Sequence, residues 1–277
     1  MPGSGWVSAD SSLVIHAEFT THANYLNHIC ERSVGLGVHA STASKPNPHS
    51  IPALVSKKIK LATLTMSNID SEMDQINKFR DYAQICSSWI PVKSYYLFFN
   101  LLMVLEWLID DNLDWLSGTH EEVNRQLKEL IRGGVLSFSE PAFNAIIPAG
   151  RVATWKIPSG SNIVIGNPDL KTRQRQVIKK ILEYKKDEFK RRNDIKRLVG
   201  LKKSNFISRT DLNLWEFLYW YRIKANYRDM EFLESGVNIS DFFYYYLNYH
   251  TLSCNFYKSF TSEINRLSNT KYEVSLF

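Results

Sequence analysis

The sequence predicts a mainly α fold, a helical bundle with a small β-containing insertion. Apolar residues recur at helical spacing over long stretches of the middle and of the last third of the chain. One stretch, residues 94–109, is apolar on most faces, as expected for a central helix. Between Gly133 and Leu170 the sequence is instead rich in Gly, Pro and β-branched residues, which predicts an ordered, non-helical insertion.

We expect two parts: an N-terminal segment over residues 1–55 that is partly irregular, and a helical domain over residues 56–277 with the insertion at about 134–169. The chain has 277 residues, of which 44% are hydrophobic and 22% charged, so it can bury a sizeable core. The N-terminal segment is rich in Ser, Thr, Gly and His and ends in the loop-like stretch STASKPNPHSIP. One helix, over residues 12–31, is expected there.

The cysteines and the first residues indicate a cytoplasmic protein. Cys30, Cys86 and Cys254 are odd in number, far apart and without a CxxC pair, which fits a reducing compartment. The start, MPGSGWVSADSS, lacks the basic and apolar stretches of a secretory signal peptide. The apolar stretch 94–109 is shorter than the roughly 20 residues that span a bilayer and contains polar side chains, so no membrane association is predicted.

The helices of the middle of the chain follow from spacing and from start and stop signals. Ser71 is a potential N-cap. The apolar side chains of the helix that it would begin are Met73, Ile76, Phe79, Ala83 and Cys86. The next helix opens at SSWIPVKSYY, where Pro91 is tolerated because the first turn of a helix needs no N–H donor. A third helix is expected over residues 120–132, ending at Gly133.

Three more helices are predicted beyond the start of the insertion. The insertion itself contains VATWKIPSGSNIVIG, residues 152–166, which is typical of a small hairpin that turns at Pro158 to Gly160. A basic helix is expected over residues 170–198. Two aromatic-rich helices, over residues 211–234 and 240–267, close the chain, with a break at Ser235-Gly236.

The basic helix carries the clearest prediction of a partner. Between Lys171 and Lys203 there are fourteen Lys and Arg residues but four acidic ones, a local charge of +10 against +6 for the whole chain. The expected inner face comprises Val177, Ile178, Ile181, Leu182, Phe189 and Ile195. The cationic side chains expected to contact nucleic acid are Arg173, Lys180, Lys186, Arg191, Arg192 and Lys202. Such a surface predicts salt-sensitive binding to RNA or DNA phosphates, or else binding to an acidic protein.

A line of polar residues lies on the apolar face of the first aromatic-rich helix. At 100° per residue, Arg222, Asn226 and Asp229 fall on the side of the apolar residues, whereas Glu216 falls on the opposite side. A buried, unpaired charge is costly, so Arg222 needs an acidic partner. Glu106, in the apolar stretch 94–109, and Asp110, directly after it, are carboxylates that can pair with it across the core. We therefore predict a buried polar cluster of Arg222, Asn226, Asp229 and Glu106.

Two stretches resemble HEPN domains. VKSYYLFFNLLMVLEWL is similar to the helix of that family in which a Tyr-Tyr pair opens an apolar run. YRIKANYRDMEFL, followed by an aromatic helix, is similar to the later Arg-x-x-Ala-Asp/Asn-Tyr segment. The resemblance extends over about residues 71–116 and 211–267. It implies an α-helical bundle, dimeric or paired with another protein, that belongs to a bacterial toxin–antitoxin or phage-defence system and often acts on RNA.

The resemblance leaves two alternatives for function. Ribonucleolytic HEPN proteins carry an Arg and, roughly four to six residues later, a His on one helix, whereas here Tyr227 follows Arg222 after four intervening residues. A phenol with a pKa near 10 is a poor general base where an imidazole would act. The leading hypothesis is therefore a binding and assembly module. The alternative is a metal-independent ribonuclease, or RNA endonuclease, in which Arg222, Asn226 and Tyr227 stabilise the charged transition state.

Neither a metal site nor a cofactor is predicted. His16, His22 and His28 recur every six residues, which turns each about 120° from the last around a helix, so they cannot converge on one ion.

The last helix predicts a protein interface. Its apolar stripe comprises Phe242, Tyr246, Tyr249, Leu252, Phe256, Phe260, Ile264 and Leu267. Tyr244, Tyr245 and Tyr257 fall off that stripe, which provides more aromatic surface than one core face uses. We expect a homodimer or a subunit of a larger complex.

Overall fold

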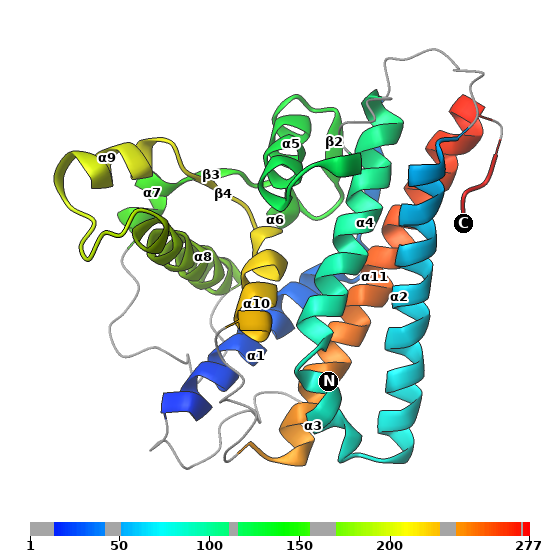
Figure 1. Cartoon of the computed structure of the whole chain (residues 1–277), viewed down its shortest axis with the longest axis horizontal. Helices are drawn as coiled ribbons and strands as arrows, with labels where there is room; N and C mark the ends of the chain where they lie inside the picture. Colours follow the sequence, from blue (N-terminus) through cyan, green and yellow to red (C-terminus); the bar gives the residue numbers. More distant parts are fainter. Residues whose placement is uncertain (1–13, 42–50, 111–115, 156–169, 228–236, 273) are drawn as a thin grey trace. The chain divides into compact units, whose positions relative to one another are not determined.

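The computed structural model describes residues 14–41, 51–110, 116–155, 170–227, 237–272 and 274–277 (Figure 1). Within these ranges lie eleven helices and four short strands. The predicted fold class, a helical bundle with a small β-containing insertion, is confirmed.

The chain divides into two compact units, each made of two separate segments. We call residues 29–144 and 238–277 the bundle unit, and residues 1–28 and 145–237 the basic unit. This division differs from the one predicted at residue 55, because residues of the predicted N-terminal segment belong to both units.

Three long helices form the centre of the bundle unit. They are α2 (Ala53–Lys78), α4 (Ile90–Asp110) and α11 (Ile239–Tyr272), which run side by side in Figure 1. Because α4 packs against both α2 and α11, most of its surface is covered, which explains a sequence that is apolar on most faces. The short helix α3 (Tyr82–Ser87) packs against α11.

The helix α4 confirms two predictions from the sequence. Pro91 lies in its first turn, directly after Ile90. Among the described residues α4 is the one helix that is long and apolar enough to cross a membrane, but 83% of its apolar window is buried inside the protein. It is therefore a core helix of the bundle.

The helix α5 (His120–Arg132) has the predicted bounds. A capping box begins it: the Thr119 hydroxyl accepts the Glu122 N–H, and the Glu122 carboxylate accepts the Thr119 N–H. Gly133 follows as the C-cap. Local signals alone thus suffice to define both ends of this helix.

The predicted helix start at Ser71 is wrong. Ser71 lies inside α2, which begins eighteen residues earlier, after Pro52, and ends at Lys78. The buried stripe of α2 is Val55, Ala62, Met66, Ile69, Met73 and Ile76. Because this helical spacing continues on both sides of Ser71, the helix has no end there for a capping residue to stabilise. Phe79, predicted in the core, follows the last turn and is exposed.

The stripe predicted on α11 is confirmed, since every one of its eight residues is buried. The helix continues to Tyr272, five residues beyond the predicted end. Tyr245, expected at an interface, is fully buried and contacts the Tyr249 ring edge-on, so this helix buries more than one face. Tyr244 does remain partly exposed.

Two small antiparallel pairs supply the β structure. β1 (Val38–Ala40) pairs with β2 (Leu136–Phe138), and β3 (Ile147–Pro148) pairs with β4 (Asp211–Leu212). The helices α6 (Pro141–Asn144) and α7 (Ala149–Ala153) lie between them in the chain. The predicted hairpin at 152–166 is wrong in its first arm, because Val152 is a buried residue of α7. The rest of that hairpin lies outside the described residues.

The basic unit contains residues 14–28 of α1 (Val14–Ser33), together with α8 (Leu170–Arg192), α9 (Gly200–Ser208) and α10 (Glu216–Tyr227). The helix predicted over 12–31 corresponds to α1. The helix α8 ends six residues before its predicted end, near Asp194, whose φ of 49° lies in the left-handed region. The helix α10 begins at Glu216 rather than at residue 211, because residues 211–212 form β4 and the Asn213 side chain accepts the Glu216 N–H at 3.1 Å. The predicted break at 235–236 lies outside the described residues.

Candidate functional sites

The basic helix α8 has the predicted inner face over its first half. Val177, Ile178, Ile181 and Leu182 are fully buried, whereas Phe189 is half-buried and Ile195 lies beyond the helix. The inner face is therefore confirmed for about two turns, and the chain after Arg192 continues into the separate helix α9.

Several of the predicted nucleic-acid contacts form local ion pairs. Arg191 and Arg192 both bind the Glu188 carboxylate, at 2.6 Å and 2.9 Å. The hydrogen bond from Arg191 lowers the pKa of Glu188 to about 2, so this carboxylate stays charged at neutral pH. Lys180 lies 3.6 Å from the Glu183 carboxylate. These side chains neutralise part of the charge of α8 within the helix itself.

A run of exposed positive charge follows α8. Residues 195–209, which we call the cationic segment, contain no acidic residue. Its five cationic side chains are Lys196, Arg197, Lys202, Lys203 and Arg209, and all of them are exposed. Of the other predicted contacts, Lys202 belongs to this segment, while Arg173 and Lys186 are half-buried on α8. No ion pair joins any of the five to a carboxylate among the described residues.

The structure describes only part of the polar line predicted on α10. Arg222 is buried, with 7% of its surface exposed, and its guanidinium lies 5.4 Å from the centre of the Tyr219 ring. The burial predicted for Arg222 is therefore confirmed. The side chains of Asn226 and Tyr227, and the whole of Asp229, lie outside the described residues, so their places in the cluster and in the catalytic alternative stay predictions.

Glu216 was predicted on the solvent side of this helix, and that prediction is wrong. Its side chain is fully buried and forms an ion pair with Lys185 of α8 at 2.9 Å. The Lys185 ammonium also lies 3.4 Å from the Asp211 carbonyl oxygen. Because α8 covers this side of α10, the two helices bury a charge pair where an isolated amphipathic helix would face water.

Glu106 is buried in the middle of α4. Neither carboxylate oxygen has a hydrogen-bond partner among the described residues, and burial raises its pKa well above the usual 4.5. Glu106 belongs to the bundle unit and Arg222 to the basic unit. The predicted cluster of these two residues stays a prediction.

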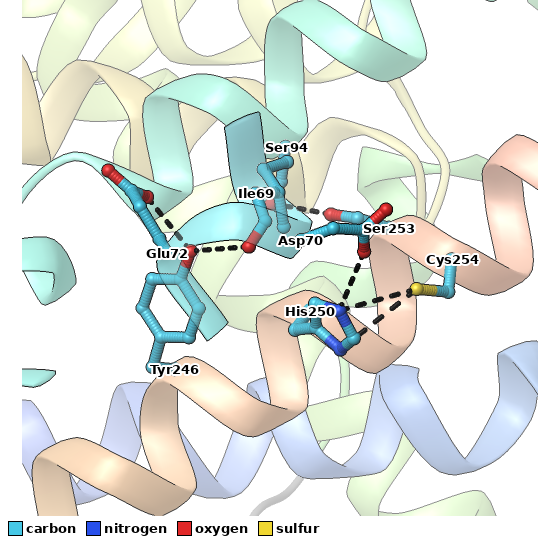
Figure 2. Close-up of polar contacts among 8 residues, drawn as sticks. All are labelled: Ile69, Asp70, Glu72, Ser94, Tyr246, His250, Ser253 and Cys254. Carbon is cyan, nitrogen blue, oxygen red and sulfur yellow. Dashed lines mark hydrogen bonds and ion pairs between the residues drawn. The ribbon is translucent and has the colours of Figure 1, made fainter. Parts of the chain in front are cut away.

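The structure also brings together three side chains that the sequence analysis did not connect. In Figure 2 dashed lines join the His250 imidazole to the Asp70 carboxylate and to the Cys254 sulfur. The distance from His250 Nε2 to Asp70 Oδ1 is 2.9 Å, and that from Nε2 to Cys254 Sγ is 3.7 Å. One ligand atom from each residue lies within 4.8 Å of the others. Asp70 is exposed, and the other two are half-buried.

Hydrogen bonds hold the helices on both sides of this cluster (Figure 2). One turn before His250, the Tyr246 hydroxyl donates to the Glu72 carboxylate at 2.8 Å and lies 3.1 Å from the Ile69 carbonyl oxygen. Next to Cys254, the Ser253 hydroxyl lies 2.8 Å from that of Ser94 on α4. The register of α11 against α2 and α4 is thus fixed at the cluster.

Two of the three residues of this cluster can be connected from the sequence alone. His250 and Cys254 are four residues apart, so they share one face of a helix. Asp70 is 180 residues away in sequence, and only the packing of α2 against α11 shows that it belongs with them.

Comparison with known protein families, with curated proteins and with solved structures finds no match to this chain.

Proposed function

We propose that this protein is an HEPN-like helical module of a bacterial anti-phage defence or toxin–antitoxin system, located in the cytoplasm, which binds nucleic acid and assembles with further protein chains. The observation that carries the binding function is the cationic segment, with five exposed cations and no carboxylate over residues 195–209. It extends the positive charge that the sequence concentrates between Lys171 and Lys203.

The contrast with α8 supports a polyanionic ligand for this segment. Arg191 and Arg192 already share the Glu188 carboxylate, so a phosphate has to compete with it for their hydrogen bonds. The cationic segment contains no carboxylate of its own. Each lysine or arginine that neutralises a phosphate releases condensed counterions, which makes the binding favourable at low salt and independent of base sequence.

The burial of Arg222 supports binding rather than RNA cleavage. A guanidinium that stabilises charge on a phosphate in the transition state has to reach the scissile group. With 7% of its surface exposed and the Tyr219 ring beside it, Arg222 is better placed to stabilise the basic unit. We therefore do not propose the ribonuclease alternative as the function.

The test is the salt dependence of nucleic-acid binding by the full chain. Fluorescence anisotropy of a labelled tRNA and of a labelled DNA duplex is measured at several NaCl concentrations. The logarithm of the affinity is expected to fall linearly with the logarithm of the salt concentration. In the double variant Lys202→Gln/Lys203→Gln, the slope is expected to decrease by roughly 2, because up to two phosphate contacts are lost.

The matched control is Lys57→Gln/Lys60→Gln on α2. These lysines are also exposed and have no ion pair among the described residues, and their replacement changes the net charge by the same amount. Equal effects of both double variants would show that binding depends on net charge and not on the cationic segment. If the wild-type chain binds neither nucleic acid at low salt, the proposal is wrong.

Exposed apolar side chains support the assembly part of the proposal. Phe79, Ile85 and Trp89 lie where α2, α3 and α4 meet, and they are 66%, 66% and 56% exposed. Isolated exposed apolar residues are common, but three within eleven residues of sequence indicate a contact surface for another protein.

A further inference from the structure

We propose that Asp70, His250 and Cys254 form a zinc site in the bundle unit. The three residues offer a carboxylate oxygen, an imidazole nitrogen and a sulfur within 4.8 Å of one another. This inference is independent of nucleic-acid binding, since the cationic segment belongs to the basic unit.

The distances are close to those of a tetrahedral zinc centre. With bonds of about 2.0 Å to nitrogen and oxygen and about 2.3 Å to sulfur, tetrahedral angles place nitrogen about 3.3 Å from oxygen and about 3.5 Å from sulfur. The corresponding distances from His250 Nε2 are 2.9 Å to Asp70 Oδ1 and 3.7 Å to Cys254 Sγ. The ligand atoms of Asp70 and Cys254 lie within 4.8 Å of each other, and the exposed Asp70 side chain can move to admit the ion.

The same imidazole nitrogen serves both neighbours, which distinguishes this cluster from a nucleophilic triad. In a Cys–His–Asp triad the thiol and the carboxylate bind opposite nitrogens of the imidazole. Here Nε2 is bonded to Asp70 and is also nearer to Cys254 Sγ than Nδ1 is, at 3.7 Å against 4.0 Å.

The donor set selects the class of metal. Sulfur and imidazole ligands favour zinc over magnesium and calcium, which prefer oxygen ligands throughout. His250 and Cys254 come from one turn of α11, and Asp70 comes from the facing α2, so two packed helices hold the three ligands. Because Asp70 is exposed, the fourth position of the ion faces water. A zinc ion with three protein ligands and one water is open to a further ligand.

The hydrogen bonds beside the cluster fix the ligands before a metal arrives. Tyr246 and Ser253 flank His250 on α11 and tie it to α2 and to α4. Ligands that are already held lose little conformational entropy on binding an ion.

Cobalt(II) as a spectroscopic probe for zinc tests the proposal on the full chain. One Co²⁺ per chain is expected to bind, with the near-ultraviolet charge-transfer band of a cobalt–thiolate bond and the strong visible bands of tetrahedral cobalt. Zinc is expected to displace it. Cys254→Ser is expected to abolish the thiolate band, and Asp70→Asn to weaken zinc binding by roughly tenfold or more, measured by competition with a chromogenic chelator.

Matched variants control for other histidines and acids. Asp74→Asn changes an exposed acid one turn further along α2, and His39→Ala changes an exposed histidine of β1, so neither should alter the spectrum or the affinity. Zinc is also expected to raise the Tm of the wild-type chain but not that of Asp70→Asn, and a Tm of Asp70→Asn equal to that of the zinc-free wild type shows that the loss of binding is not a loss of folding. A Co²⁺ spectrum without the thiolate band, or zinc affinity that is unchanged in both ligand variants, overturns the proposal.

Discussion

Lys185 of α8 and Glu216 of α10 form an ion pair with 2.9 Å between Nζ and Oε2, and the Glu216 side chain has no exposed surface. Desolvation makes such a pair a weak source of net stability, but the removal of one partner leaves a charge in the interior. The pair therefore makes the packing of these two helices depend on charge matching.

We expect Lys185→Ala to lower the free energy of unfolding by about 3 kcal/mol, because the Glu216 carboxylate loses its cation in a buried place. The double variant Lys185→Met/Glu216→Leu should recover most of that loss, since it removes both charges. Urea denaturation measures both effects. Lys186→Ala, at the next position and without an ion pair among the described residues, is the control and should change stability by less than about 0.5 kcal/mol. An equal loss in both single variants would mean that the pair is not needed for packing.

Glu106 gives a prediction for the dependence of stability on pH. Its pKa is raised by burial, so between the usual 4.5 and the raised value the folded chain retains a proton that the unfolded chain releases. Over that range this residue should lower the free energy of unfolding by up to about 1.4 kcal/mol for each unit of rising pH. Glu106→Gln lacks this dependence and should become progressively more stable than the wild type as the pH rises above the usual 4.5.

The opposite sign would reveal an ion pair at Glu106. If a guanidinium such as that of Arg222 neutralised the carboxylate, its pKa would be lowered, and the wild type would gain stability over Glu106→Gln as the pH rises. The series of urea denaturation curves therefore also tests the buried polar cluster predicted from the sequence.

Replacement of Arg222 distinguishes a structural from a catalytic role of this residue. We expect Arg222→Ala to lower the free energy of unfolding by about 2 kcal/mol, because the buried guanidinium and its packing on Tyr219 are lost. Arg209→Ala, which changes an exposed arginine, should have little effect. In parallel, wild type and Arg222→Ala are incubated with total RNA and with tRNA. Cleavage by the wild type that disappears in Arg222→Ala, while the variant stays folded, would favour the ribonuclease alternative instead.

The helices were predictable where local signals and packing agree. α4, α5 and most of α11 follow from spacing and caps, because each contains its own start, stop or stripe. The helix start predicted at Ser71 was wrong because a serine does not end or begin a helix where the apolar stripe continues on both sides of it. β1 to β4 are two or three residues long and pair with distant segments, so no alternating pattern marks them.

The candidate sites show the same limit. The positive charge between Lys171 and Lys203 was predicted from the sequence, but of the five cations of the cationic segment only Lys202 was among the predicted contacts. The spacing of four residues places His250 and Cys254 on one helix face, but the third ligand, Asp70, comes from another helix. The burial of Glu216 could not be predicted from the apolar pattern of α10 alone, because the cation that neutralises its carboxylate, Lys185, belongs to α8.

The exposed apolar surface of Phe79, Ile85 and Trp89 predicts self-association. A two-fold dimer brings the same patch of both copies together, so each copy covers these side chains of the other. We expect the wild type to be a dimer at micromolar concentration in size-exclusion chromatography with light scattering, and Ile85→Ser to be more monomeric. The control is Leu64→Ser, which changes an exposed residue about 22 Å away from Phe79 along α2 and should leave the dimer intact. A wild type that is monomeric at every concentration would assign this surface to a different protein partner.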